Sequence, residues 1–331
     1  MKPAMKAYTI QLEAGSTVLA SREAPVPVAG ADQVLVRLHA AGLNRGEFIA
    51  THGLHAKAGA PKQAGVEGAG EIVAVGAGVA HLKAGERVMG RCSGAFAEYA
   101  LMEAREAIAM PPGLSWEEAA AVPLAFMVVH DMPIAQGKLA AGEWLLVTGV
   151  SSGVGVAALK TAKLLGARVI GTSGSAEKLE KLKAPGLGLD VGIRTRSADF
   201  CAAVMQATGG LGANLIVNNV GGSVFAECVR SLAFEGRLAT VGYVDGVMKA
   251  EIDIDALHSK RLTLFGVSNK LRNAEQRATT ARGLVADLLP MIADGRLRPV
   301  IDRVFQFDEL PAAKAYMESN AHLGKIVVRM P

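Results

Sequence analysis

Only three cysteines occur in this chain of 331 residues, and they lie far apart, at Cys92, Cys201 and Cys228. Their number and spacing fit neither a disulfide framework, which needs paired cysteines, nor a metal cluster built on a CxxC motif. A small secreted domain held together by disulfides is therefore excluded. We expect a reducing, cytoplasmic setting.

Long apolar runs, aromatic residues and an excess of one charge are also missing. No stretch of about 18 residues is apolar and free of charge, and the N-terminal residues turn polar too early for a secretory signal. Aromatic residues make up 5% of the chain, and 35 basic against 31 acidic residues leave a formal net charge of +4. The charges give no field of a single sign, and the local basic clusters lack interleaved aromatic residues on which bases could stack, so we expect a soluble protein that binds neither membranes nor nucleic acids.

Apolar residues and glycine are abundant instead. Half of the residues are apolar, 20% are charged and 38 are glycine, a balance typical of a compact α/β protein. The length exceeds what one hydrophobic core usually organises, so we expect two domains.

The N-terminal third has its own predicted elements. Ser115 precedes two acids and is a predicted helix N-cap. Up to about residue 110, short β-type runs between glycine turns predict a small, strongly bent sheet or barrel, with strands near 34–43, 70–79, 86–90 and 95–102.

A different sequence pattern begins after residue 143, where strand-length apolar runs alternate with helix-length segments. This alternation predicts right-handed βαβ units in a doubly wound parallel sheet, an α/β fold class. The expected strands cover 144–148, 167–172, 214–218, 237–241 and 262–267, and the expected helices cover 154–165, 176–183, 198–207 and 223–232. Beyond residue 270 we expect a helix at 274–294, another from Asp308 and a last strand at 325–329.

The turn between the first strand of this region and the following helix carries the strongest chemical signal. A glycine-bearing turn that opens a helix presents free N–H groups and the positive end of the helix dipole, which favour a pyrophosphate. Against the GxGxxG pattern, Val150 and Ser152 occupy the first two glycine positions, so the motif alone also fits an ordinary strand-to-helix turn. The flanking strands favour dinucleotide binding, and the predicted phosphate-binding residues are Ser151, Ser152, Gly153, Val154 and Gly155.

The residues after the second strand of this region indicate which nicotinamide cofactor binds. NAD sites usually place an acid there for the ribose hydroxyls, whereas this chain reads TSGS at 172–175. Hydroxyl groups and nearby cations suit the extra 2′-phosphate of NADP(H). The predicted contacts are Ser173, Ser175, Lys178 and Arg194, with Arg196 as an alternative to Arg194 and a solvated helix-face role as an alternative for Lys178.

Five segments spread over nearly the whole chain carry a family resemblance. They are AAGLNRGEF at 40–48, the glycine-rich run at 65–88, the cofactor turn, NNVGG at 218–222 and the C-terminal segment at 295–328. Together they resemble the medium-chain dehydrogenase/reductase superfamily, in its zinc-independent quinone oxidoreductase branch, which includes zeta-crystallin. The resemblance implies a GroES-like bent β-barrel substrate domain made of residues 1–120 and 268–331, and a Rossmann NADP-binding domain over 121–267.

The same resemblance bears on catalysis. Leu43 lies where zinc-dependent relatives have a ligand cysteine, Val66 stands where they have a histidine before Glu67, and no four-cysteine lobe surrounds Cys92. The resemblance therefore implies no catalytic zinc. Without a metal, the oxygen that gains charge needs a hydrogen-bond donor, and Asn44 matches the family's asparagine that faces nicotinamide and substrate. An asparagine that caps a turn is the alternative.

Some positions depart from the family pattern. Ile49 and Thr195 replace tyrosines, and Val128 replaces a threonine, which implies a more apolar acceptor pocket. The candidate pocket residues, each with ordinary packing as the alternative, are Phe48, Phe126, Met127 and His130. Three histidines, His52, His55 and His130, are candidate proton donors, although surface or packing roles suit each of them.

The backbone after the fifth and sixth strands is expected to hold the nicotinamide carboxamide, because open α/β sheets bind ligands at the carboxyl ends of their strands. An ordinary domain crossover is the alternative. The residues concerned are Gly242, Tyr243, Val267, Ser268 and Asn269. In relatives, the strand at 262–267 pairs across a two-fold axis, so the resemblance also implies a homodimer.

The function expected from all of these features is NADPH-dependent transfer of a hydride to a quinone or an α,β-unsaturated carbonyl, without zinc. Two alternatives stay open. One is reduction of a 2-enoyl thioester, which needs a channel and basic surface for the carrier. The other is an NADPH-binding protein with little turnover, like the lens crystallins.

Overall fold

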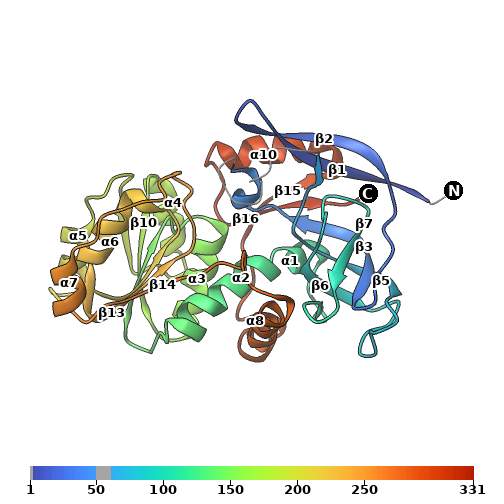
Figure 1. The fold of residues 1–331 in the computed structure, drawn as a ribbon. Coiled ribbons are helices and arrows are strands. Elements are labelled where there is room, and N and C mark those ends of the chain that lie inside the picture. Colours follow the sequence, from blue (N-terminus) through green and yellow to red (C-terminus); the bar gives the residue numbers. More distant parts are fainter. Residues whose placement is uncertain (1–2, 50–60) are drawn as a thin grey trace. The chain divides into compact units, whose positions relative to one another are not determined.

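The computed structural model of the chain describes residues 3–49 and 61–331. Contacts divide the chain into two compact units (Figure 1). Unit 1 consists of Met1–Met127 and Arg272–Pro331, and unit 2 consists of Val128–Leu271. Each unit has its own sheets and its own hydrophobic core.

The described residues of unit 1 form two β-sheets. The smaller has the strand order β2-β1-β4, and the larger has the order β15-β16-β3-β5-β6-β8, with β7 also paired to β3. Strands from both ends of the sequence therefore meet in one sheet. The bounds are β1 Ala4–Glu13, β2 Ser16–Pro25, β3 Gln33–Gly42, β4 Lys62–Gln63, β5 Glu67–Val75, β6 Arg87–Arg91, β7 Tyr99–Glu103, β8 Ile108–Ala109, β15 Ile301–Gln306 and β16 Lys325–Arg329.

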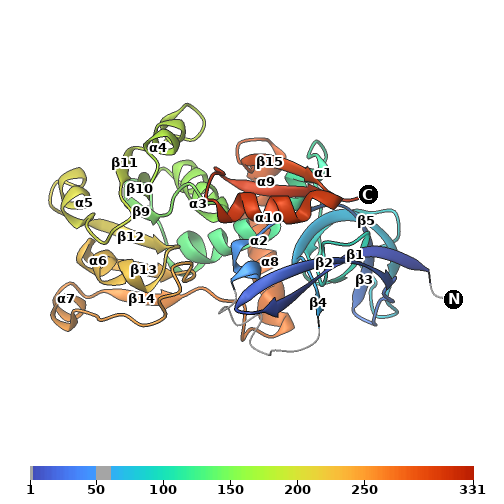
Figure 2. The same cartoon turned by 90° about the horizontal axis from the view of Figure 1, so that it is seen from above.

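Irregular pairing and close packing of strands shape the larger sheet. The β3–β5 pair has two register shifts within residues 35–40 of β3, and such bulges bend and twist a sheet. Figure 2 shows β5 as a curved strand. The two strands also approach closely, since a Cβ placed on Gly70 would lie 2.0 Å from the carbonyl oxygen of Arg37. The four strands expected in this region are confirmed as β3, β5, β6 and β7.

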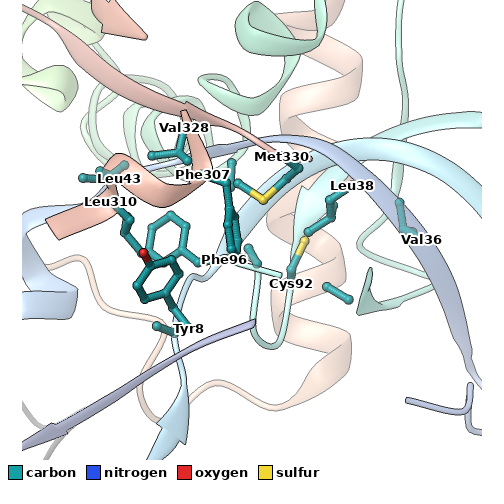
Figure 3. Close-up of a cluster of buried hydrophobic side chains, with 14 of the residues drawn as sticks. Tyr8, Val36, Leu38, Leu43, Cys92, Phe96, Phe307, Leu310, Val328 and Met330 are labelled. Carbon is teal, nitrogen blue, oxygen red and sulfur yellow. The ribbon is translucent and has the colours of Figure 1, made fainter. Parts of the chain in front are cut away.

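The core of unit 1 joins the N-terminal strands to the C-terminal segment. Figure 3 shows Tyr8 of β1, Phe96 and Phe307 among the buried side chains of this cluster. The rings of Tyr8 and Phe307 lie with their centroids 5.1 Å apart. Val328 of β16 and Leu310 belong to the same cluster and are fully buried. Residues about 300 positions apart in sequence therefore share one core, which fixes β16 against the strands that carry the site described below.

The helices of unit 1 confirm one prediction and correct another. Ser115 caps α1 in a capping box with Glu118, as predicted. The single helix expected at 274–294 is wrong, because the chain forms α8 and a separate α9 with a break at Leu288. Pro290 explains the break, since proline has no N–H to donate and its ring clashes with the preceding turn. The remaining bounds are η1 Arg45–Phe48, α1 Trp116–Ala120, α8 Ala274–Asp287, α9 Leu289–Ala293, η5 Phe307–Glu309 and α10 Leu310–Glu318.

Unit 2 is a six-stranded parallel sheet with the order β11-β10-β9-β12-β13-β14. This is the Rossmann order, in which β10 and β11 are added on one side of β9, and β12, β13 and β14 are added on its other side. The helix α2 (Pro123–Val129), most of which belongs to unit 1, and the π-helix η3 (His130–Gln136) precede the sheet in sequence. The bounds are β9 Trp144–Thr148, α3 Gly153–Leu164, β10 Arg168–Ser173, α4 Ala176–Lys183, β11 Val191–Arg194, α5 Cys201–Ala207, β12 Ala213–Asn218, η4 Gly222–Val224, α6 Phe225–Arg230, β13 Leu232–Thr240, α7 Ile254–Ser259 and β14 Thr263–Gly266.

The alternation of strand-length and helix-length segments predicted this sheet correctly. All five expected strands are confirmed, as β9, β10, β12, β13 and β14, and the expected helices correspond to α3, α4, α5 and the η4–α6 segment. The strand β11 was not among those expected, because it has four residues, includes Gly192 and is only half-buried. Within the described part of the chain, no helix has the length and apolar character needed to cross a bilayer.

Candidate cofactor and active site

The turn after β9 is the predicted phosphate-binding segment, and its geometry depends on two glycines. Gly149 has a φ of +63°, a left-handed conformation that glycine adopts without strain. A Cβ on Gly155 would lie 2.6 Å from the carbonyl oxygen of Gly149 and 2.7 Å from that of Val150. Any side chain at Gly155 would therefore push the first turn of α3 away from the strand.

The valine in place of the first motif glycine has a structural explanation. Val150 is fully buried, and its side chain occupies space above Gly171 of β10. A Cβ on Gly171 would lie 2.5 Å from Cγ1 of Val150. The neighbouring strand thus supplies the glycine that the turn lacks, and the incomplete motif still packs closely.

The N-terminus of α3 presents unpaired donors. The hydroxyl oxygen of Ser152 accepts the N–H of Gly155 at 3.1 Å, and the hydroxyl donates to the carbonyl of Gly149 at 2.9 Å. The N–H groups of Gly153 and Val154 have no acceptor among the described residues. Free N–H groups at the positive end of a helix bind anions, so this turn fits the pyrophosphate of a dinucleotide.

The end of β10 carries the residues expected at the 2′-phosphate. Ser175 caps α4 by accepting the N–H of Lys178 at 3.3 Å, and the Ser173 hydroxyl oxygen accepts the N–H of Ser175 at 3.3 Å. The guanidinium of Arg196 lies directly against Gly174, since a Cβ there would be 2.3 Å from Nε and 2.8 Å from Cζ. The structure therefore places Arg196, rather than any acid, beside this strand end.

The carboxyl ends of the central strands meet at one edge of the sheet. Pairing aligns Thr148 of β9 with Asn218 of β12, Asn218 with Thr240 of β13, and Thr240 with Gly266 of β14. The predicted carboxamide-binding segments, 242–243 and 267–269, follow the last two of these strands. Their contact with a cofactor stays a prediction.

A buried hydrogen-bond network orders this edge. The Thr148 hydroxyl lies 3.2 Å from the amide oxygen of Asn218 and accepts the N–H of Asn219 at 3.0 Å. The Asn218 oxygen also accepts the N–H groups of Val220 and Gly221. The segment NNVGG, which entered the prediction only through family resemblance, thus shapes the loop after β12.

Asn44, the predicted catalytic residue, belongs to a polar cluster in unit 1. Its side-chain nitrogen donates to Oε1 of Glu67 at 2.8 Å, and its oxygen accepts from Nζ of Lys325 at 2.9 Å. Lys325 also donates to Glu67 Oε1 at 2.6 Å. The Asn44 side chain makes no capping bond to η1, although Asn44 precedes that turn. The alternative role as a helix-type cap is therefore not seen, and Asn44 remains partly exposed beside buried charges.

A second carboxyl group, that of Glu47, adjoins the cluster. Its Oε2 accepts the N–H of Gly65 at 3.1 Å, and its Oε1 lies 3.4 Å from the Asn44 nitrogen. Burial, together with the nearby Glu67 charge, raises the pKa of Glu47 from 4.5 to about 8, against the opposing effects of Asn44, Lys325 and the Gly65 amide. Glu47 is therefore mainly protonated at neutral pH.

The positions that hold zinc in metal-dependent relatives carry hydrocarbon side chains here. Leu43 is 3% exposed and belongs to the core of unit 1, and Val66 is half-buried. Within the described residues, no group of three or more histidine, cysteine, aspartate or glutamate side chains is arranged to hold a metal ion.

The remaining candidate residues are buried or fall outside the described ranges. Phe48, Phe126, Met127 and His130 are all buried, at 7% exposure or less, so their packing role is evident and their contact with a substrate stays a prediction. His130 begins the π-helix η3. His52 and His55 lie outside the described residues.

Sequence reasoning missed two members of the Asn44 cluster, Glu47 and Lys325, and treated Glu67 only as a neighbour of Val66. A signal was present in the sequence. Glu67 and Lys325 interrupt strand-like apolar runs, where charged residues are almost never fully buried unless paired. Charges inside two runs that resemble buried strands could have indicated a buried ion pair.

Comparison with known proteins fits these features. Residues 153–281 match the family model "Zinc-binding dehydrogenase", and residues 30–112 match "Alcohol dehydrogenase GroES-like domain". The pikromycin polyketide synthase component PikAII of Streptomyces venezuelae is 31% identical over 309 residues. The alignment covers 93% of this chain but 8% of the synthase, so the chain spans a small part of that relative.

Solved structures are similar over nearly the whole chain. A mycobacterial protein in complex with NADPH has a TM-score of 0.88 at 26% identity, and a quinone oxidoreductase of Pseudomonas syringae has 0.87 at 25%. The CurK enoyl reductase has a TM-score of 0.83 at 26% identity. Each alignment covers 98% of this chain and 99% of the other. With its GroES-like and Rossmann folds confirmed, the chain belongs to the medium-chain dehydrogenase/reductase superfamily, which has zinc-independent quinone oxidoreductases among its members.

Proposed function

We propose that the chain is an oxidoreductase that uses NADPH to reduce a quinone or an α,β-unsaturated carbonyl. The cofactor fits the free N–H groups of Gly153 and Val154, the acid-free end of β10 and the similarity to a protein solved with NADPH. We assign the cofactor to unit 2 and the acceptor to unit 1. The predicted boundaries, 1–120, 121–267 and 268–331, differ by a few residues from the division of the units after Met127 and Leu271.

One observation carries the choice of acceptor. Among the described residues, the side-chain nitrogen of Asn44 has one short hydrogen bond, to Glu67 at 2.8 Å, and longer contacts, at 3.4 and 3.5 Å, to Glu47 and the carbonyl of Gly42. Its second N–H is thus weakly used, and the residue is partly exposed. A donor of this kind suits a carbonyl oxygen that gains negative charge during reduction.

Conjugated acceptors match a site of this chemistry. When bound, NADPH would supply a hydride to the β-carbon of the acceptor, and the electron pair of the C=C bond would shift toward the carbonyl. The negative charge moves to the carbonyl oxygen, where the Asn44 N–H would stabilise it. Water then protonates the α-carbon, and no metal-held oxygen is required.

A 2-enoyl thioester is the alternative acceptor, favoured by the similarity to the CurK enoyl reductase and to a polyketide synthase. The thioester is itself an α,β-unsaturated carbonyl, so the same donor serves both reactions. The difference lies in the carrier that brings the acyl group. Recognition of that carrier distinguishes the two activities.

The test is NADPH oxidation against a matched panel of quinones, enones, aldehydes and enoyl-CoA. We expect turnover with quinones or enones and none with simple aldehydes, because an isolated carbonyl lacks the conjugated path for charge. Turnover with enoyl-CoA and with no other acceptor would show that the chain is a 2-enoyl thioester reductase instead. Tight NADPH binding without turnover on any acceptor would favour a non-catalytic protein instead.

We further propose that Arg196 selects NADPH over NADH through the 2′-phosphate. It lies against Gly174 at the end of β10 and has no acidic partner among the described residues. Arg194 lies in β11 itself, paired with Ser173. We expect Arg196→Ala to raise the Kd for NADPH about ten- to hundredfold, the value of a charge-assisted hydrogen bond, and to leave the Kd for NADH unchanged.

Binding of both cofactors is measured by calorimetry, with Arg194→Ala as the matched control and Lys178→Ala as a test of the third cation. An equal loss for NADPH and NADH in Arg196→Ala would contradict the assignment, as would selectivity that depends on Arg194. An unchanged NADPH preference in Lys178→Ala would remove Lys178 from the phosphate site.

A homodimer is proposed through β14. This strand lies at the edge of the six-stranded sheet, and within the described residues its ladder partner is β13. Its outer backbone groups are therefore available to a second copy. A monomeric mass by light scattering at micromolar concentration would refute the proposal.

A further inference from the structure

Unit 1 contains a buried ion pair to which the proposed reaction gives no direct part. Glu67 is completely buried, and the Lys325 side chain is 6% exposed. Burying two charges is costly unless they are paired and fully hydrogen-bonded, so such a pair calls for an explanation beyond stability.

All three N–H donors of Lys325 and both carboxylate oxygens of Glu67 have partners. The ammonium of Lys325 has three N–H groups and three acceptors: Oε1 of Glu67 at 2.6 Å, Oδ1 of Asn44 at 2.9 Å and the carbonyl of Leu43 at 2.9 Å. Glu67 Oε1 accepts from Lys325 and Asn44, and its Oε2 accepts the N–H of Leu124 at 2.7 Å. The pair therefore ties together β16, β5, the start of η1 and the first turn of α2.

The two charges also determine which way the Asn44 amide points. The amide oxygen faces the ammonium, and the amide nitrogen faces the carboxylate. A rotation of the amide by 180° would place N–H groups against Lys325 and the oxygen against Glu67, so that both contacts become repulsive. Only one orientation is compatible with the ion pair.

We propose that Lys325 and Glu67 are positioning residues for Asn44, whose amide they hold in a single orientation by acting on its oxygen and its nitrogen together. The catalytic consequence rests on the proposed function of Asn44, whereas the orientation itself does not. Glu47, which also faces the amide, makes the longer contact and is not required for this orientation.

The orientation is tested without catalysis by the hydrogen exchange of the Asn44 side-chain amide in NMR spectra. The signal is identified as the amide pair that disappears in Asn44→Ala. We expect Lys325→Met to accelerate this exchange by about tenfold or more, because a charge-assisted hydrogen bond is lost, and Lys325→Arg to restore part of the protection. Arg329→Met on the same strand, where the arginine pairs with Glu117 at the surface, is the matched control and should leave the exchange unchanged.

Lys325→Met leaves Glu67 as an unpaired buried charge and is the variant at risk of not folding. The double variant Glu67→Gln/Lys325→Met removes both charges, which proteins tolerate better, and it is expected to show the same fast exchange. The glutamine oxygen can accept from either Asn44 or the Leu124 N–H but offers one oxygen where Glu67 offers two. Unchanged exchange in the double variant would overturn the proposal whatever the activity.

Kinetics then separate the two proposals. With the best acceptor of the panel, the double variant should lower kcat by a similar factor to Asn44→Ala, with the Kd for NADPH unchanged, and adding Asn44→Ala to it should cause little further loss. Additive losses would show that the ion pair acts independently of Asn44 and would contradict positioning. Fast exchange together with an unaltered kcat in Asn44→Ala would leave the positioning intact and would refute the catalytic role of Asn44.

Discussion

Replacing Gly155 with alanine is expected to destabilise the fold by about 1–3 kcal/mol, as overpacked sites do, and to weaken NADPH binding by at least about tenfold. The new methyl group would lie 2.6 and 2.7 Å from two carbonyl oxygens of the turn after β9. Backbone atoms cannot rotate away as a flexible side chain can. The first turn of α3 must shift, and the N–H groups of Gly153 and Val154 shift with it.

Urea unfolding and calorimetric titration with NADPH measure the two effects. Gly30→Ala is the matched control, because Gly30 is exposed in unit 1 and a Cβ there would meet only the flexible side chain of Gln33, so neither quantity should change greatly. Wild-type affinity in a destabilised Gly155→Ala protein would show that the pyrophosphate does not bind at this turn.

Glu47→Gln is expected to flatten the dependence of stability on pH between about 5 and 8. Burial raises the pKa of the Glu47 carboxyl from 4.5 to about 8 in the folded protein. In this interval the folded chain keeps a proton that the unfolded chain has released. The free energy of unfolding therefore falls as pH rises, by at most about 1.4 kcal/mol per pH unit from this group.

The stabilising contribution of Glu47 is complete below about pH 4.5 and is lost as pH rises towards 8. Glutamine has no proton to release, so the variant lacks this slope. Among the described residues, the charged groups that act on Glu47 are Glu67 and Lys325, and both are unchanged in the variant. Urea unfolding at four pH values compares wild type with Glu47→Gln, and the exposed Glu23→Gln serves as control. Equal slopes in wild type and Glu47→Gln would mean that Glu47 is ionised in the folded protein.

The fold was predictable where local pattern and final environment agree. The central strands β9, β10 and β12 are mostly buried apolar runs of five or six residues, which the sequence pattern predicts directly. The pattern did not predict β11, which is short and only half-buried. It also predicted one helix across Pro290, because the apolar periodicity continues there although proline interrupts the helix. In both cases a local constraint opposed the periodicity.

The candidate site was predictable only where its residues are neighbours in sequence. The turn at 149–155 shows its strand, glycines and helix in one segment. The compensation of Val150 by Gly171 depends on the pairing of β9 with β10, and no local pattern reveals it. The contact of Lys325 with Glu67 joins residues 258 positions apart, through the pairing of β16 with β3 and of β3 with β5.

The return of the C-terminal strand to the first sheet has a consequence for biosynthesis. Unit 2 is one continuous stretch of chain, so all of its strands are synthesised before β16. Unit 1 must wait for β16, which supplies Lys325 and closes the sheet beside β3. Until then Glu67 has no cation, and the strands around it have an open edge, the kind of surface on which nascent chains aggregate. The strand β16, which is synthesised late, therefore completes the sheet that contains the early strand β3 and supplies the cation of the buried ion pair.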